Sequence, residues 1–142
     1  MICGLEVIIN KPAVEPEHFD FSGKTILNVT DSLAGLDVIA LMLETLHANY
    51  IRARDGAEAV EICRQNQNVD LILMDIQMPI MDGLEAAQEI RKFNPNVPII
   101  GITYSGLKNG LEVSKEAGCN DIFFKPVEMK RLIKMIDNYL KK

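Results

Sequence analysis

The stretch LILMDIQMPIMDG, from Leu71 to Gly83, decides how this chain is interpreted. Four apolar residues lead directly into Asp75. A carboxylate that follows an apolar run costs free energy unless a cation or a metal ion lies beside it. The stretch therefore indicates a buried strand that ends at a functional or paired carboxylate.

The composition is typical of one soluble globular domain. The chain has 142 residues, of which 48% are hydrophobic and 25% charged, and its net charge of -5 gives no electrostatic case for nucleic-acid binding. No apolar run approaches a membrane span, and the first residues lack the features of a signal peptide, so we expect a cytoplasmic protein. The three cysteines, Cys3, Cys63 and Cys119, are widely spaced, which favours reduced thiols over a metal site.

The N-terminal segment differs from the rest of the chain. Residues 1–22 show no sustained hydrophobic period, and the stretch NKPAVEPEHFDFSG contains two prolines and several acids. We expect an N-terminal tail or linker over residues 1–22, followed by a single domain over residues 23–142.

Strand-like and helix-like segments alternate along that domain. Short apolar runs typical of buried parallel strands are TILNV (25–29), YIRA (50–53), DLILM (70–74), VPIIGI (97–102) and DIFF (121–124). Apolar residues at helical spacing follow each run, within residues 36–46, 56–66, 82–93, 109–118 and 132–140. The alternation predicts a flavodoxin-like α/β fold: a five-stranded parallel sheet of strand order 2-1-3-4-5, with helices on both faces.

Polar residues stand at the carboxyl ends of these strands, where open α/β sheets bind their ligands. They are Thr30 and Asp31, then Asp75, then Thr103, and finally Lys125 with Pro126. Two carboxylates suit a hard divalent cation such as Mg²⁺. An aspartate can also act as a nucleophile that forms an aspartyl phosphate, while a lysine and a hydroxyl bind the phosphoryl oxygens.

A purely structural interpretation of the same residues exists. Asp31 could cap the first helix, and Asp75 could form an ion pair with Lys125.

The stretches LILMDIQMPIMDG, IIGIT and FFKP together resemble the receiver domain of bacterial two-component signalling, over about residues 23–142. The resemblance implies that Asp75 accepts a phosphoryl group from a kinase histidine. It also implies that Asp31, Asp75 and the backbone carbonyl of Gln77 bind Mg²⁺. The reaction would be a Mg²⁺-dependent self-phosphorylation within a phosphorelay.

The resemblance assigns roles to three further residues. Thr103 would contact the phosphoryl group and act as a switch, and Lys125 would bind the phosphoryl group. The bond from Lys125 to Pro126 is usually cis in this family, which helps to aim the lysine. The stretch FDFSGKTIL additionally resembles the linker that enters the receiver domains of hybrid histidine kinases.

The resemblance also implies the partners. They are a histidine kinase or a histidine phosphotransfer domain, and a homodimer could form through the segments 109–118, 121–124 and 132–140. No direct contact with nucleic acid or membrane is expected.

Three positions depart from the family pattern. Thr30 stands where the family normally has a second acid before Asp31, so Mg²⁺ affinity should be lower. Asn28 occupies a usually apolar position of the first strand and needs a partner if it is buried. Ile122 replaces a common aromatic switch residue, for which Tyr104 is a candidate substitute.

Two other classes of function stay open at this point. Thr30 favours a pseudo-receiver, a protein-interaction module that keeps the fold but takes no phosphate. A flavodoxin-like ligand binder is less consistent with the chain, because TDSLAG offers an acid where a phosphate loop needs donors. A small phosphatase is also less consistent, because we find no cap insertion or second domain that would select a substrate.

Overall fold

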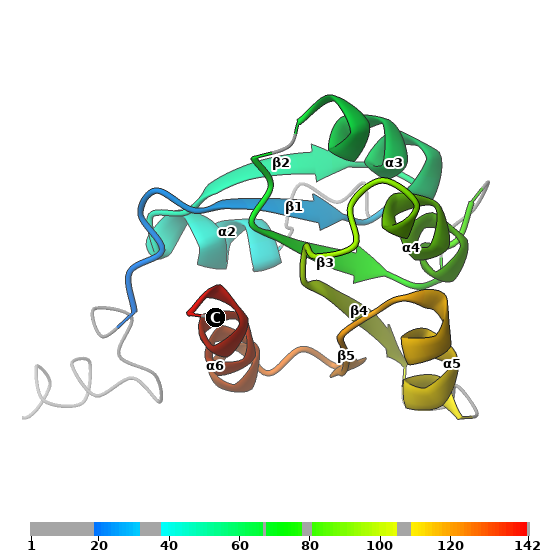
Figure 1. The fold of residues 1–142 in the computed structure, drawn as a ribbon. Helices are drawn as coiled ribbons and strands as arrows, with labels where there is room; N and C mark the ends of the chain where they lie inside the picture. Colours follow the sequence, from blue (N-terminus) through cyan, green and yellow to red (C-terminus); the bar gives the residue numbers. More distant parts are fainter. Residues whose placement is uncertain (1–18, 32–37, 67, 78–80, 105–108, 142) are drawn as a thin grey trace, which may run out of the picture.

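The computed structural model describes residues 19–31, 38–66, 68–77, 81–104 and 109–141. Its strands are β1 (Thr25–Val29), β2 (Asn49–Ala53), β3 (Leu71–Asp75), β4 (Ile99–Tyr104) and β5 (Asp121–Lys125). They form one parallel sheet in the order β2-β1-β3-β4-β5 (Figure 1). This arrangement confirms the predicted topology.

Helices connect the strands, as the alternating pattern predicts. They are α2 (Val38–Thr45), α3 (Gly56–Gln65), α4 (Gly83–Arg91), α5 (Gly110–Ala117) and α6 (Met129–Leu140). The predicted start of the first helix, near residue 36, lies outside the described residues. No helix in the described ranges is long and apolar enough to cross a membrane.

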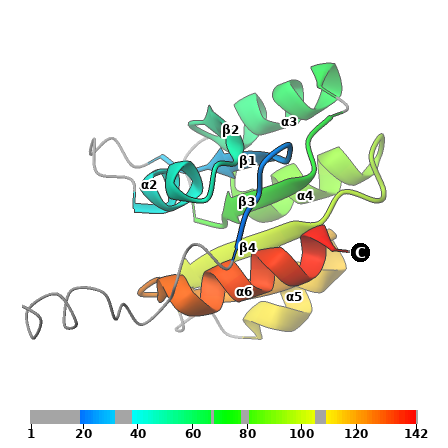
Figure 2. The same cartoon turned by 90° about the vertical axis from the view of Figure 1, so that its left-hand side faces the viewer.

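Two hydrophobic clusters lie on the two faces of the sheet. One contains the buried residues of α2 and α6, and the other contains those of α3 and α4. Figure 2 shows α2 and α3 on opposite sides of the strands. Along β3, Leu71 and Leu73 join the first cluster, whereas Ile72 and Met74 join the second. Burial on both faces explains why this strand is a continuous apolar run rather than an alternating one.

The packed structure begins before residue 23. Phe21 is only 2% exposed, belongs to the cluster under α2 and α6, and donates its backbone N–H to the carbonyl of Leu46 at 2.9 Å. Phe21 therefore packs with the domain although it precedes residue 23. The sequence hid this because a single pair of phenylalanines in a polar segment has no periodicity.

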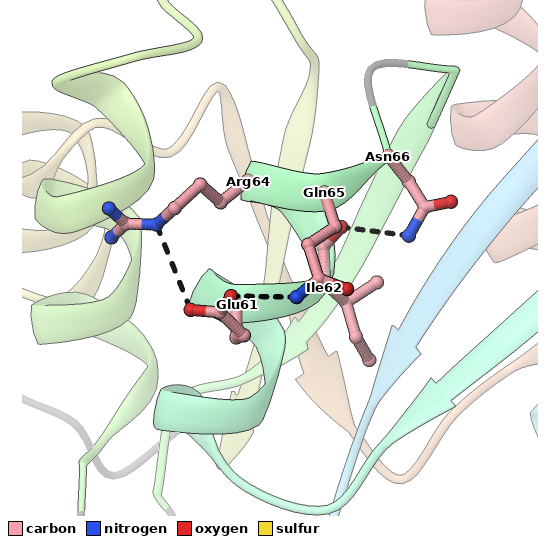
Figure 3. Close-up of polar contacts among 5 residues, drawn as sticks. All are labelled: Glu61, Ile62, Arg64, Gln65 and Asn66. Carbon is pink, nitrogen blue, oxygen red and sulfur yellow. Dashed lines mark hydrogen bonds and ion pairs between the residues drawn. The ribbon is translucent and has the colours of Figure 1, made fainter.

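The C-terminal end of α3 is stabilised by local polar contacts (Figure 3). Asn66 donates both its backbone N–H and its side-chain amide to the carbonyl of Ile62, at 2.8 and 3.0 Å. Gln65 donates to Glu61 at 2.9 Å, and Arg64 lies 3.8 Å from the same carboxylate. The two bonds from Asn66 satisfy a carbonyl that a helix end would otherwise leave without a partner.

Candidate functional site

The candidate site lies at the carboxyl edge of the sheet. Because β1, β3, β4 and β5 are parallel neighbours, their last residues all reach this edge (Figure 1). β3 ends at Asp75, β4 ends just after Thr103, and β5 ends at Lys125. Thr30 follows β1 and is fixed to β2 by a backbone hydrogen bond of 3.0 Å to Ala53.

Asp75 is the buried acid of this edge, since its side chain is only 9% exposed. One carboxylate oxygen, Oδ2, lies 3.3 Å from the Lys125 ammonium, and the other, Oδ1, accepts the backbone N–H of Gln77 at 3.2 Å. The structure therefore brings Asp75 and Lys125 together from strands separated by β4. The ion pair expected from the purely structural interpretation is present. A phosphoryl acceptor with a neighbouring cation requires the same pair of residues.

Opposing effects act on the ionisation of Asp75. Burial raises the pKa of this carboxyl above its ordinary value, and the negative charge of Asp31 raises it further. The Lys125 ammonium and the N–H of Gln77 lower the pKa, but burial is the largest effect. Asp31 itself is exposed, and its carboxylate is close enough to repel the negative charge of Asp75.

Thr103 presents a buried hydroxyl at the next strand end. Its side chain is 0% exposed, and its Oγ1 has no hydrogen-bond partner in the structure. Within the described residues only one other buried side-chain oxygen, Oγ of Ser114 in α5, shares this property. A buried hydroxyl without a partner costs about 1–3 kcal/mol, and the Thr103 hydroxyl is free to donate a hydrogen bond at the edge where β4 ends.

Lys125 has a second neighbour that the sequence did not reveal. Its ammonium nitrogen lies 5.0 Å from the centroid of the Tyr104 ring, and Tyr104 is paired with Lys125 across the two strands. The predicted cis bond between Lys125 and Pro126 is present.

The loop that follows Asp75 is held by the start of α4. Asp82 caps this helix, as its place before Gly83 predicts, by accepting the N–H of Glu85 at 2.9 Å. Gly83 donates its N–H to Ile76 at 2.9 Å, and the position of a Cβ on Gly83 would be 2.5 Å from the Asp75 carbonyl oxygen. Only glycine allows so close an approach, so the helix start fixes the backbone of the candidate acceptor.

The oxygen donors at this edge fit a hard divalent cation. Asp31, Asp75 and the carbonyl of Gln77 are the ligand types that Mg²⁺ prefers, with water in the remaining positions. No group of three or more histidine, cysteine or acidic side chains suited to a metal occurs in the part of the chain that the structure describes.

The comparisons with known proteins agree with this geometry. The family model of the response regulator receiver domain matches residues 26–137. This chain belongs to the response regulator receiver domain family. It is therefore a receiver domain of two-component signal transduction.

Two individual proteins show how similar this chain is to other receiver domains. It is 36% identical over 115 residues to Two-component system protein A of Emericella nidulans. The aligned region covers 80% of this chain but only 17% of that protein. The receiver domain of sensor histidine kinase PA1611 from Pseudomonas aeruginosa PAO1, solved with a magnesium ion coordinated in its active site cleft, superposes with a TM-score of 0.77. The two sequences are 32% identical, and the match covers 85% of this chain and 100% of the other.

A third similar structure contains a signalling partner. It is the co-crystal structure of the Saccharomyces cerevisiae histidine phosphotransfer signaling protein Ypd1 with the receiver domain of its downstream response regulator Ssk1. The match has a TM-score of 0.76 and 30% identity, over 84% of this chain and 90% of that one.

The raised pKa of Asp75 leads to a prediction about stability. An acid whose pKa is raised on folding destabilises the fold when ionised. This cost is fully present above the folded-state pKa and disappears below the unfolded-state value near 3.8. Asp75→Asn should therefore raise the free energy of unfolding near neutral pH, and the gain should shrink as the pH falls. Urea unfolding of both proteins, from neutral pH down to the unfolded-state pKa, measures this difference in the free energy of unfolding. A variant less stable than the parent at neutral pH would mean that the contact with Lys125 outweighs the cost of burial.

Proposed function

We propose that this receiver domain accepts a phosphoryl group on Asp75, with Mg²⁺ bound by Asp31, Asp75 and the backbone carbonyl of Gln77. The observation that carries the proposal is a buried carboxylate 3.3 Å from a lysine ammonium, at an edge that also holds a buried hydroxyl without a partner.

The chain's own residues supply most of the chemistry. A carboxylate oxygen of Asp75 attacks the phosphorus of a phosphohistidine; the new P–O bond forms as the P–N bond breaks, and the imidazole leaves with the electron pair of that bond. The Lys125 ammonium favours the ionised, nucleophilic form of Asp75 and then binds a phosphoryl oxygen. The Thr103 hydroxyl donates a hydrogen bond to another phosphoryl oxygen. When bound, Mg²⁺ neutralises part of the negative charge that gathers at the reacting group.

The donor is a histidine kinase or a histidine phosphotransfer protein, acting from the same polypeptide or from a separate one. The similarity to a receiver domain that was crystallised with a histidine phosphotransfer protein supports this donor class. The test is incubation with a phosphorylated histidine phosphotransfer protein, with Mg²⁺ and with a chelator, followed by intact mass. One phosphoryl group should transfer, and only when Mg²⁺ is present. Absence of transfer from this donor and from a small phosphoramidate donor would contradict the proposal.

A pseudo-receiver that takes no phosphate is the second candidate, and Thr30 is the observation that favours it. A threonine in place of an acid removes one negative charge beside the cation, although its hydroxyl can still hold a water molecule.

Thr30→Asp is therefore expected to bind Mg²⁺ about tenfold more tightly, a difference of roughly 1.4 kcal/mol. The added carboxylate attracts the cation, and phosphorylation should become faster to match. Thr30→Asn is the neutral control and should bind as the parent protein does. Mg²⁺ titration followed by tyrosine fluorescence or NMR compares the three. Equal affinities would mean that Thr30 is neutral, and absence of binding in all three would favour the pseudo-receiver.

Self-association is proposed for the face formed by α5, β5 and α6. β5 is an edge strand that exposes Phe124 by 43%, and the neighbouring α5 exposes Leu111 and Val113 by 43% and 39%. With Mg²⁺ and the phosphate mimic beryllofluoride, the protein should sediment as a dimer at increasing concentration, whereas Phe124→Lys should stay monomeric. A wild-type protein that remains monomeric under these conditions would rule the dimer out.

A further inference from the structure

Tyr104 occupies an unusual position for a large aromatic residue. It is the last residue of β4 and follows Thr103 directly, yet its side chain is 59% exposed. An exposed tyrosine at the rim of a site contributes little to the hydrophobic core. Its contacts with residues of the site are therefore the ones to consider. The contact that the structure shows is with Lys125, whose ammonium nitrogen lies 5.0 Å from the ring centroid.

The Lys125 ammonium therefore has two neighbours at once. The Asp75 carboxylate lies 3.3 Å away, and the face of the Tyr104 ring lies on the ammonium as well. The lysine side chain is 28% exposed, so solvent reaches part of the ammonium and its long stem keeps rotamer freedom unless something restrains it. The ring attracts the cation and restrains it at the same time.

The strand register explains why the contact forms. Tyr104 and Lys125 are direct partners in the pairing of β4 with β5. The position three residues before the lysine, where an aromatic residue is common in the family, holds Ile122 instead. This side chain is 7% exposed and has no ring. Tyr104 is thus the aromatic side chain in contact with Lys125 among the described residues.

We propose that Tyr104 is a positioning residue for Lys125: its ring holds the ammonium beside Asp75 before the phosphoryl group arrives. This inference rests on the proposed phosphorylation of Asp75, because it assigns Lys125 a role in that step. Tyr104 itself contacts neither Asp75 nor the incoming group in this account. Its effect on the reaction passes through the lysine alone.

Two variants separate the ring from the hydroxyl. Tyr104→Phe keeps the ring and should label with a small phosphoramidate donor and Mg²⁺ at the parental rate. Tyr104→Leu keeps an apolar side chain without a ring and should label about two- to five-fold more slowly at saturating donor, the loss expected from one partly exposed cation–π contact. Because Tyr104 is exposed, neither variant should change the unfolding temperature appreciably.

A second readout does not depend on phosphorylation. The ring should shift the NMR resonances of the Lys125 ε-methylene protons in the metal-free protein. This shift should persist in Tyr104→Phe and vanish in Tyr104→Leu. If no protein labels but the shift behaves in this way, the proposed function fails while the contact stands.

The outcomes that overturn the inference are distinct. Labelling at the parental rate in both variants would show that the ring does not position Lys125. Slower labelling in both would assign the effect to the hydroxyl, and faster labelling in Tyr104→Leu would mean that the ring obstructs the donor instead.

Discussion

Asp75→Asn should abolish phosphorylation by both a phosphorylated histidine phosphotransfer protein and a small phosphoramidate donor. The amide nitrogen and oxygen of asparagine cannot replace the carboxylate nucleophile, so no acyl phosphate can form. The loss should be complete rather than partial, because Asp75 is the buried acid beside Lys125 at this edge. Since the variant is expected to be at least as stable as the parent near neutral pH, unfolding cannot account for the loss. Intact mass after incubation with donor and Mg²⁺ measures the labelling.

Asp82→Asn is the matched control for this experiment. Asp82 stands at the far end of the same loop, but its carboxylate caps α4 through the N–H of Glu85 at 2.9 Å. Because asparagine also caps helices well, the variant should label normally and lose little stability. Labelling that survives in Asp75→Asn but fails in Asp82→Asn would move the acceptor to the helix cap and contradict the assignment.

Gly83→Ala should destabilise the domain by about 2–3 kcal/mol, although alanine is intrinsically about 1 kcal/mol better than glycine inside a helix. The reversed sign follows from the packing. The added Cβ would lie 2.5 Å from the Asp75 carbonyl oxygen and 2.8 Å from Cα of Ile76, and both are backbone atoms that cannot rotate away. The acceptor loop must move to make room, so labelling should slow as well. Urea unfolding and the labelling rate report the two effects.

Gln88→Ala provides the comparison within the same helix. Gln88 is exposed in α4, so the change should alter the free energy of unfolding by no more than about 0.5 kcal/mol. If Gly83→Ala proved as stable as this control, the close approach of α4 to the backbone of β3 would not constrain the acceptor loop.

The fold followed from the sequence because each element has a strong local signal. Apolar runs without alternation indicate strands buried on both faces, and Leu71–Met74 is such a run. The cap at Asp82 and the apolar spacing of the helices add agreement between local and global preferences. The packing of Phe21 against the domain had no such signal and emerged only from tertiary contacts.

The site could be predicted in part. Asp75 and Lys125 could be placed at one edge from topology alone, because each ends a strand of the same parallel sheet. The contact of Tyr104 with Lys125 could not, since it depends on the register of β4 against β5, which uniformly apolar strands leave undetermined. Asn28 is 2% exposed and is not without a partner, as a buried amide requires, but its neighbours in the sequence do not identify that partner.

Locating the phosphoryl group itself tests whether Asp75 is the acceptor. The protein is phosphorylated by a histidine phosphotransfer protein in Mg²⁺, the acyl phosphate is reduced with borohydride, and the peptides are sequenced by mass spectrometry. Residue 75 alone should be converted to homoserine. Conversion at any other aspartate, or intact Asp75 in a protein that has gained a phosphoryl group, would contradict this assignment.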